Sequence, residues 1–399
     1  MFENEIIFLL PLAKPRFFWY TKLISYCYVE DDMSNTSSYT QNGGRRPRRR
    51  RSVFARSMIT IGRTILVVLV TAALVFVSVY SACMILAHGP STDARDKLVS
   101  SLNETSALKF LPYWFLPAET VEQILDHPRE VTQPDEFRFL RTEPAEGEDY
   151  TDPEDEPLVQ IDESAVTDEV EVIDIRKSTF KGKMLIVHDP SRVIVGTLNR
   201  WGGYGWYLSE FVENYDALAG TNAGSFEDPN GGGTGGIPDG LVMRDGEISY
   251  GSRNATYNGV IGFDANHVMH VGRMTGQEAL DLGLVTAVSF PPGPTLIKDG
   301  VKQTGLGGGV NPRTCVGQRA DGAVLILVVE GRHPDSIGAT YDDLADLMEE
   351  YGAVNAGNLD GGSSSAMIYE GVQITHGSNL IGSRPIATAI LVLREGDGK

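Results

Sequence analysis

The sequence predicts an α+β fold, built mainly from antiparallel β-sheet with a few packed helices and preceded by a single transmembrane helix. Three observations lead to this prediction. One uncharged apolar run lies near the N-terminus, Asp-Gly and Glu-Gly pairs recur between strand-like runs after residue 172, and few segments of that region have helical spacing. Tight turns of this kind join antiparallel strands, and a few helices can then pack against the resulting sheet.

The apolar run at Thr64–Ala87 contains 24 residues and no charge. A helix needs about 20 apolar residues to cross a bilayer, whereas the apolar core of a signal peptide has only about 7–15. We therefore expect a single-pass signal anchor in a cell membrane, with a cleaved signal peptide as the alternative. Arginines cluster before the run, from Arg45 to Arg63, without an acid among them. The positive-inside rule then places residues 1–63 in the cytoplasm and residues 88–399 outside the cell.

The charge pattern also restricts the partners. The net charge is −19, which argues against a nucleic-acid partner for the whole chain. The basic cluster beside the apolar run suits anionic lipid instead. Within the expected cytoplasmic tail, the polar stretch that begins at Met33 resembles an ordinary tail, so we expect the natural start at Met33.

Two connecting segments follow the apolar run. Residues 88–118 have apolar residues at near-helical spacing and form a predicted juxtamembrane segment. Residues 119–171 hold 19 acids against three arginines. Such a composition has little to bury, so it predicts an extended acidic linker between the membrane and a domain at 172–399.

The predicted domain consists of hairpins and two helices. Tight turns join strand-like runs in four segments: "GLVMRDGEISYG", "TLIKDGVKQT", "CVGQRADGAVLILVVEG" and "AMIYEGVQI". The segment "LSEFVENYDAL" predicts one helix. "TYDDLADLMEEYG" predicts the other, because Thr340 is suited to its N-cap, Asp343 to the third position and Gly352 to its end.

Several familiar catalytic motifs are absent from the sequence. It contains no G-x-S-x-G, no G-x-x-x-x-G-K-[ST] and no H-E-x-x-H. This argues against an α/β-hydrolase, a P-loop enzyme and a zincin. The remaining candidates for chemistry are four polar, glycine-rich turns between apolar strands.

The first two turns carry hydrogen-bonding and cationic groups. "GTNAGSFEDPNGG" places Asn222, with a donor and an acceptor, among glycines that allow close approach, although taken alone the stretch is better explained as a cluster of β-turns. "GGGVNPRTCVG" places Arg313 on a loop stiffened by Pro312. A guanidinium there is suited to a phosphate, and a surface ion pair is the alternative.

The other two turns carry carboxylates. "LILVVEGRHPDS" runs from a buried strand directly into Glu330, which could act as an acid, a base or a nucleophile. "NLDGGSSS" places Asp360 before two glycines whose N–H groups could form an anion-binding nest. A carboxylate beside such a nest suits a glycosyl phosphate, which offers an electron-poor carbon and a phosphate together.

The four turns and one further stretch near the C-terminus occur in one order. This order resembles that of the phosphodiester glycosidase family, whose bacterial relatives are described as exopolysaccharide-biosynthesis-like, and the resemblance covers about residues 175–396. The stretches are "TNAGSFEDPNG", "NPRTCVGQRADG", "VVEGR", "NLDGGSSSAM" and "RPIATAILVL".

The resemblance implies a hydrolase that cleaves the bond between a sugar and phosphate in a glycosyl-1-phosphodiester. With the expected anchor, we expect the substrate to be a cell-surface polysaccharide or wall polymer, and we expect no cofactor and no metal. The resemblance also implies that Asp360 and Glu330 are the catalytic carboxylates, one acting on the anomeric carbon and the other activating water. The implied substrate- and phosphate-binding residues are Asn222, Arg313, Thr314, Arg332, Gly361, Gly362, Ser363 and Arg384.

Two other functions stay open from the sequence. The domain could be a non-catalytic surface module that binds a phosphate-containing polymer or a protein partner. It could also be a metal-dependent phosphodiesterase that uses Asp360, Glu330 and His333, although a dense ligand cluster is not evident in the sequence.

Overall fold

The protein is described here by a computed structural model. The structure describes residues 53–105, 108–125, 158–161, 166–229, 232–377 and 384–394. Three predicted features lie outside these residues: the expected start at Met33, the arginine cluster from Arg45 to Arg51 and most of the acidic linker.

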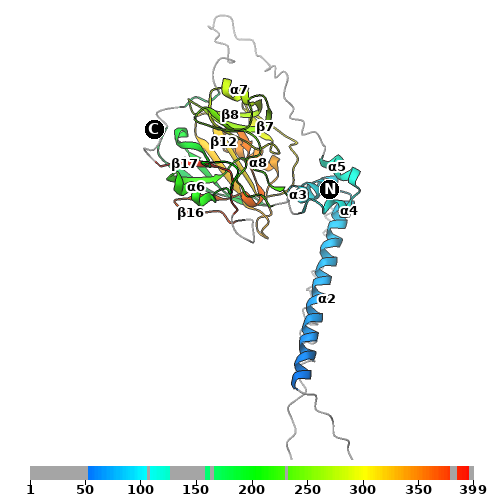
Figure 1. The fold of residues 1–399 in the computed structure, drawn as a ribbon. Coiled ribbons are helices and arrows are strands. Elements are labelled where there is room, and N and C mark those ends of the chain that lie inside the picture. The colour runs from blue at the N-terminus through cyan, green and yellow to red at the C-terminus, as the bar shows by residue number, and fades with distance from the viewer. Residues whose placement is uncertain are drawn as a thin grey trace, which may run out of the picture. The chain divides into compact units, whose positions relative to one another are not determined.

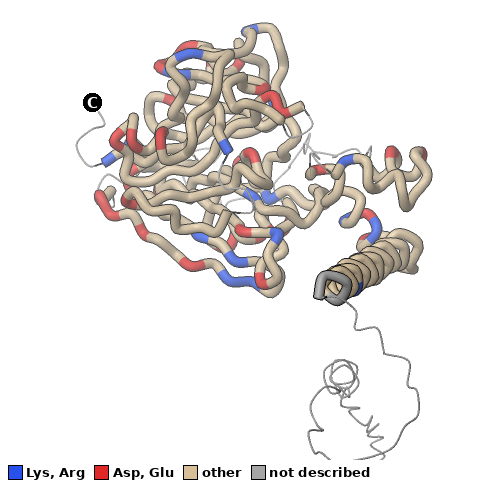
Figure 2. Tube along the Cα trace, turned by 60° about the horizontal axis from the view of Figure 1, so that its bottom comes forward, with Lys and Arg blue, Asp and Glu red and all other residues tan. Residues whose placement is uncertain are grey.

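The apolar run lies in one long helix, α2 (Val53–His88). Its stretch from Ser57 to His88 contains an 18-residue window with a mean hydropathy of 2.5, and no residue of that window is buried. Figure 1 shows the helix as a single rod, and in Figure 2 its coils are almost entirely free of charge. Among the described residues, α2 is the one helix long and apolar enough to cross a membrane.

Three short helices follow α2: α3 (Thr92–Asn103), α4 (Pro112–Phe115) and α5 (Ala118–Leu125). They share a small apolar core with the end of α2, formed by Ala87, Val99, Leu116, Val121 and Ile124. Ser91 caps α3 by accepting a hydrogen bond from the Ala94 N–H at 3.2 Å. Because α5 buries Val121 and Ile124, the first residues of the predicted linker are helical rather than extended.

The rest of the described chain forms three antiparallel sheets with a few helices, which confirms the predicted α+β fold. The central sheet has seven strands in the order β1 (Val170–Arg176), β2 (Lys181–Val187), β13 (Val324–Val329), β12 (Arg313–Arg319), β14 (Ala353–Asn358), β10 (Thr295–Lys298) and β11 (Val301–Lys302).

The other two sheets have five strands each. One has the order β16 (Val372–Gln373), β15 (Met367–Tyr369), β4 (Ala217–Asn222), β17 (Thr388–Leu393) and β3 (Val193–Thr197). The other has the order β6 (Glu247–Tyr250), β5 (Val242–Arg244), β9 (Leu284–Ser289), β7 (Thr256–Asp264) and β8 (Met269–Thr275).

The four predicted hairpins are present as β5–β6, β10–β11, β12–β13 and β15–β16. In three of them both turn residues have positive φ, for example Asp299 at 51° and Gly300 at 76°. This conformation matches the twist of the paired strands, and Asp-Gly adopts it readily. The turn chemistry therefore explains why these hairpins could be predicted.

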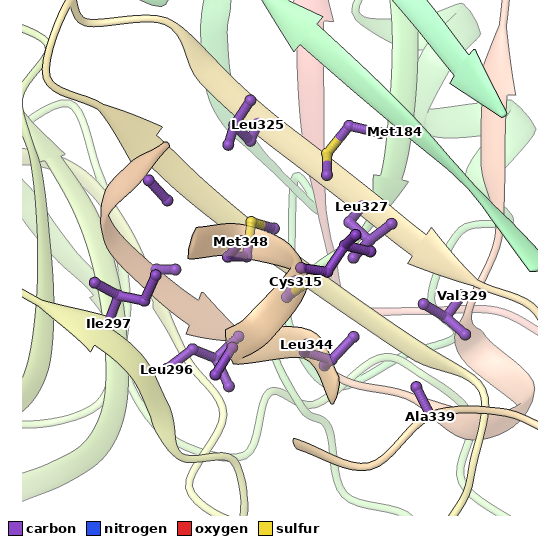
Figure 3. Close-up of a cluster of buried hydrophobic side chains, with 14 of the residues drawn as sticks. Met184, Leu296, Ile297, Cys315, Leu325, Leu327, Val329, Ala339, Leu344 and Met348 are labelled. Atoms are coloured by element: carbon purple, nitrogen blue, oxygen red, sulfur yellow. The ribbon is translucent and has the colours of Figure 1, made fainter. Parts of the chain in front are cut away.

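The middle of the central sheet is buried on both faces. Along β13, Leu325, Leu327 and Val329 point to one core, which α8 (Tyr341–Glu350) covers, and Figure 3 shows Leu327 within it. The alternate residues Val324, Ile326 and Val328 point to a second core shared with the other two sheets. A strand that is buried on both faces has a continuous run of apolar residues in its sequence.

The helices cover the outer faces. The predicted N-cap of α8 is confirmed, because Thr340 Oγ1 accepts from the Asp343 N–H and the Asp343 carboxylate accepts from the Thr340 N–H. The second predicted helix is α6 (Leu208–Asn214), which packs Leu208 and Phe211 against the sheet of β4 and β17. A third short helix, α7 (Gly276–Asp281), lies beside β8 and β9.

Truncation of Leu327 tests the importance of the core under α8. This side chain is fully buried, so Leu327→Ala is expected to lower the free energy of unfolding by about 2–5 kcal/mol. Thermal unfolding in detergent measures the effect, and the exposed Leu282 provides a matched Leu→Ala control. Equal losses for the two variants would show that Leu327 does not lie in a packed core.

Candidate active site

The predicted polar turns meet where β4, β12 and β14 end. The turn after β14, residues 359–362, lies between the turns after β4 and before β12. Three backbone hydrogen bonds hold it there: Leu359 N–H to Thr314 O (2.8 Å), Asp360 N–H to Ala223 O (2.9 Å) and Gly362 N–H to Pro312 O (2.9 Å). Three of the four predicted stretches are thus one joined unit.

Asn222 and Thr314 lie beneath this unit and are almost completely buried. The Asn222 Nδ2 donates to the Asp360 carbonyl at 2.5 Å, and its Oδ1 accepts from Thr314 Oγ1 at 2.8 Å. The Ala366 N–H also approaches this Oδ1, at 3.4 Å. Both side chains are therefore placed to position Asp360 rather than to face a ligand.

Asp360 is half-buried at the centre of the site. One of its carboxylate oxygens accepts from the Gly361 N–H at 2.9 Å. Burial raises the pKa of Asp360 from 3.8 to about 6, which outweighs the hydrogen bond from Ser364 and the positive charge of Arg384. The negative charge of Asp228 acts in the same direction as burial. Raised pKa values of this kind are common at catalytic sites.

Arg384 and Asp228 form an ion pair beside Asp360. The Arg384 Nη1 lies 2.9 Å from the Asp228 Oδ2 and 3.4 Å from the Ser363 Oγ. The guanidinium stacks over the Phe226 ring at 4.6 Å from its centroid. The other Asp228 oxygen accepts from the Gly233 N–H at 2.7 Å, which fixes the carboxylate. The sequence pointed to Arg384 and Ser363 but missed Asp228, whose only signal is its place in the first polar turn.

Arg313 is buried at the start of β12. Its Nε donates to the Ala339 carbonyl at 3.2 Å and its Nη2 to the Gly309 carbonyl at 2.6 Å. Its guanidinium lies 3.9 Å from the centroid of the Tyr341 ring. These contacts lock the side chain in one orientation, as a fixed anion-binding group requires.

Arg332 lies near Arg313 and against the Asp360 turn. A Cβ added to Gly362 would lie 3.3 Å from the Arg332 Nη2, so glycine allows this close approach. The same Nη2 donates to Asn311 Oδ1 at 3.3 Å. Burial and the positive charge of Arg313 lower the pKa of Arg332. Two crowded guanidinium groups create a strong local positive potential, which favours an anion.

A carboxylate already occupies this positive pocket. Glu104, which directly follows α3, places Oε2 at 2.7 Å from Arg313 Nη2 and 2.8 Å from Asn311 Nδ2. Its Oε1 accepts from the Gly309 N–H at 3.2 Å. Because the Glu104 carboxylate accepts all of these hydrogen bonds, the pocket can bind a negatively charged group. The sequence predicted only a juxtamembrane segment here.

The segment around Glu104 fits the pocket loop closely. Ser101 Oγ accepts from the Val310 N–H at 2.8 Å, and Thr105 Oγ1 accepts from Arg332 at 3.1 Å. A Cβ on Gly309 would lie 2.2 Å from the backbone nitrogen of Ser101. Glycine at this position therefore permits the end of α3 to reach the loop.

Residues 215–393 match the family model described as phosphodiester glycosidase. This range contains the whole Asp360 turn together with Arg313, Arg332 and Arg384. This part of the chain belongs to the phosphodiester glycosidase family. The resemblance predicted from the order of the motifs is thus confirmed.

Individual relatives of the phosphodiester glycosidase domain are distant. The chain is 30% identical over 167 residues to the SPbeta prophage-derived uncharacterized protein YomE of Bacillus subtilis (strain 168). This match covers 40% of this chain and only 26% of the length of YomE. The catalytic domain of zebrafish N-acetylglucosamine-1-phosphodiester α-N-acetylglucosaminidase, auto-inhibited by its pro-peptide, is similar at 21% identity and a TM-score of 0.48, over 59% of this chain and 86% of that one. A hypothetical protein from Synechocystis is similar at 14% identity and a TM-score of 0.40, over 56% and 61%.

Glu330, at the end of β13, makes contacts outside the Asp360 turn. Its carboxylate accepts from the His376 N–H at 2.8 Å and lies 3.1 Å from the His376 Nδ1. Its carbonyl accepts from Ser336 Oγ at 2.8 Å. Within the described residues, the carboxylate seen to act on Asp360 is Asp228. The predicted catalytic role of Glu330 stays a prediction.

The predicted nest is engaged by the protein itself. The Gly361 N–H donates to Asp360 and the Gly362 N–H donates to Pro312. In this conformation the arginines, rather than these N–H groups, offer the positive charge for a phosphate. The described part of the chain also contains no group of three His, Cys, Asp or Glu residues arranged to hold a metal ion.

The raised pKa of Asp360 makes a prediction about stability. The folded protein keeps the proton on Asp360 up to about pH 6, whereas the unfolded chain loses it near 3.8. This contribution to stability is therefore complete below pH 3.8 and is lost as the pH rises through 6. At pH 7.5, Asp360→Asn is expected to stabilise the protein by about 1–3 kcal/mol.

The pH dependence of thermal unfolding checks this expectation. The gain in Tm of Asp360→Asn over the unmodified protein is expected to shrink as the pH is lowered from 7.5 towards 4. The exposed Asp174 on β1 supplies a matched Asp→Asn control that removes a surface ion pair with Lys183. A pH-independent difference would mean that Asp360 is not destabilised by its burial.

Proposed function

We propose that this chain is a membrane-anchored hydrolase that cleaves the sugar–phosphate bond of a glycosyl-1-phosphodiester in a cell-surface polymer. One observation supports this most directly. Asp360, a carboxylate with a raised pKa, lies on the turn that packs against Arg332, and Arg332 adjoins an arginine pocket that already holds a carboxylate. A carboxylate beside an anion pocket matches a substrate with an anomeric carbon next to a phosphate.

In the proposed reaction, Arg313 and Arg332 hold the phosphate in place of Glu104. They stabilise the negative charge that develops as the bond between the anomeric carbon and oxygen breaks. A phosphomonoester is a good leaving group, so a strong general acid is less necessary than for an ordinary glycoside. The phosphomonoester leaves with the bridging oxygen, and the sugar carbon becomes oxocarbenium-like.

Asp360 acts on that carbon in the proposal, either by stabilising its positive charge or by attacking it. Arg384 and Asp228 lie beside Asp360, where the positive charge of Arg384 lowers its pKa and the negative charge of Asp228 raises it. Water delivers its oxygen to the anomeric carbon, and its proton passes to a carboxylate. Asp228 is the nearest candidate by contact, and Glu330 stays the candidate that the family resemblance implies.

The helix α2 supports the proposed location of the enzyme. The helix would anchor the chain once in the membrane, with the basic N-terminal tail in the cytoplasm and the phosphodiester glycosidase domain outside. A substrate on the cell surface fits this orientation, because the domain would then work at the same face as the polymer.

Hydrolysis assays test the proposed function. The full chain in nanodiscs is incubated with sugar-1-phosphodiesters that differ in the sugar, and release of the free sugar and the phosphomonoester is measured. Turnover of at least one substrate is expected, and Asp360→Asn is expected to turn over the same substrate far more slowly. Binding without turnover across the panel would favour the non-catalytic surface module instead.

A further inference from the structure

Three large aromatic side chains are exposed in the short segment between α3 and α5. Phe110, Tyr113 and Trp114 are 52%, 45% and 59% exposed. Phe110 and Trp114 contact each other, with ring centroids 5.5 Å apart. An exposed aromatic cluster of this size commonly marks an interaction site.

The segment folds back along the apolar helix. The Phe115 ring lies 5.5 Å from the Tyr80 ring of α2, and the Phe115 carbonyl lies 2.9 Å from the His88 Nε2. The helix rises about 1.5 Å per residue, so the contacts at Tyr80 and His88 span about 12 Å of α2. The aromatic segment therefore lies level with the last two turns of the helix.

The length of α2 places these turns at the surface of a bilayer. Arg63 is the last charged residue before the apolar run. A hydrocarbon core about 30 Å thick takes about 20 helical residues, which end near Met84. The stretch from Met84 to His88 then reaches the headgroup region, and Phe115 lies beside it.

The chemistry of the segment suits that region. Trp and Tyr are enriched at membrane interfaces because their rings are apolar and their N–H or O–H groups are polar. The exposed Lys109 adds a positive charge next to the aromatic residues, which favours lipid phosphates. Continuity with α2 distinguishes this cluster from an isolated surface patch.

We propose that residues 108–117 form a second membrane contact, with Phe110, Tyr113 and Trp114 inserted into the interfacial layer of the bilayer on the side where α2 ends. The inference rests on the membrane anchor in the proposed function, and it is independent of catalysis. Because α3 precedes this segment, the contact ties the residues around Glu104 to the membrane surface.

Fluorescence of Trp114 tests the inference in the full chain. Trp19, Trp201 and Trp206 are replaced by Phe, and the protein is placed in nanodiscs whose lipid chains carry bromine near the headgroup. We expect blue-shifted Trp114 emission that these lipids quench and that aqueous iodide quenches little. A variant that keeps only Trp206, which packs against Phe211 in the sheet domain, is expected to be insensitive to bromine.

A second reporter separates this inference from the anchor itself. Phe76→Trp, in a background without other tryptophans, reports whether α2 lies in the bilayer. If it is quenched by bromine deep in the lipid chains while Trp114 is red-shifted and quenched by iodide, the anchor stands and the second contact is wrong. If brominated lipids quench neither Trp114 nor the tryptophan of Phe76→Trp, both the anchor and the second membrane contact are wrong.

Protection of Trp114 from iodide without quenching by any brominated lipid would also overturn the inference, because a protein surface would then cover the cluster. If the triple substitution prevents folding, the difference in emission between the unmodified chain and Trp114→Phe supplies the same readout.

Discussion

Asp360→Asn is expected to lower kcat on a sugar-1-phosphodiester by about 10³-fold. In the proposed mechanism this carboxylate faces the anomeric carbon, and an amide can neither stabilise the developing positive charge nor attack it. The backbone bonds of the turn do not involve the side chain, apart from the bond from Gly361, so the fold should be retained. Initial rates of phosphomonoester release measure the loss.

The control for this experiment is Asp174→Asn, which removes one exposed carboxylate on the edge strand β1 and should leave kcat unchanged. Asp360→Asn combines two expected effects, a large loss of activity and a gain in stability at neutral pH. This combination distinguishes a catalytic group from a structural one, because replacing a structural carboxylate would lower both the activity and the stability. Full turnover by a folded Asp360→Asn protein would remove Asp360 from the mechanism.

Glu104→Gln is expected to lower KM by about 10- to 100-fold with little change in kcat. The Glu104 carboxylate accepts from Arg313, Asn311 and Gly309, and the proposed mechanism has a substrate phosphate displace it from this site. A hydrogen bond to a charged group contributes about 1.5–3 kcal/mol, so a neutral amide is more easily displaced. Substrate titrations measure KM for both proteins.

The same substitution should also affect stability in the opposite direction. It leaves the buried Arg313 without its ion-pair partner, which is expected to lower Tm, and added inorganic phosphate should restore Tm more strongly in Glu104→Gln than in the unmodified chain. Glu119→Gln, on the exposed side of α5, is the matched control. An unchanged or higher KM would show that Glu104 supports the substrate site rather than competing with the substrate.

Local chemistry explains what the sequence could predict. The hairpins depend on adjacent Asp-Gly or Glu-Gly residues that accept positive φ, and the start of α8 depends on Thr340 and Asp343, three residues apart. The Asp360 turn was also predictable, because it follows a buried strand and its glycines stand next to it. These signals lie within a few residues of the feature that they determine.

The remaining parts of the site depend on contacts between distant residues. Glu104 and Arg313 are 209 positions apart, and the residues around Glu104 carry no motif. Asp228 stands next to Glu227 in one turn, and a local pattern does not tell which carboxylate turns towards Arg384. Arg332 lies three residues beyond the end of β13 and has a φ of 62°, so the alternation of the strand could not place it relative to Glu330.

Hydrolysis in ¹⁸O-labelled water tests the central claim most directly. The full chain is incubated with a sugar-1-phosphodiester that it turns over, and both products are analysed by mass spectrometry. If Asp360 and the arginine pocket cleave the bond between the anomeric carbon and oxygen, the label appears in the sugar and the phosphomonoester stays unlabelled. Label in the phosphomonoester would mean attack at phosphorus, as a phosphodiesterase performs it, and would contradict the proposed mechanism.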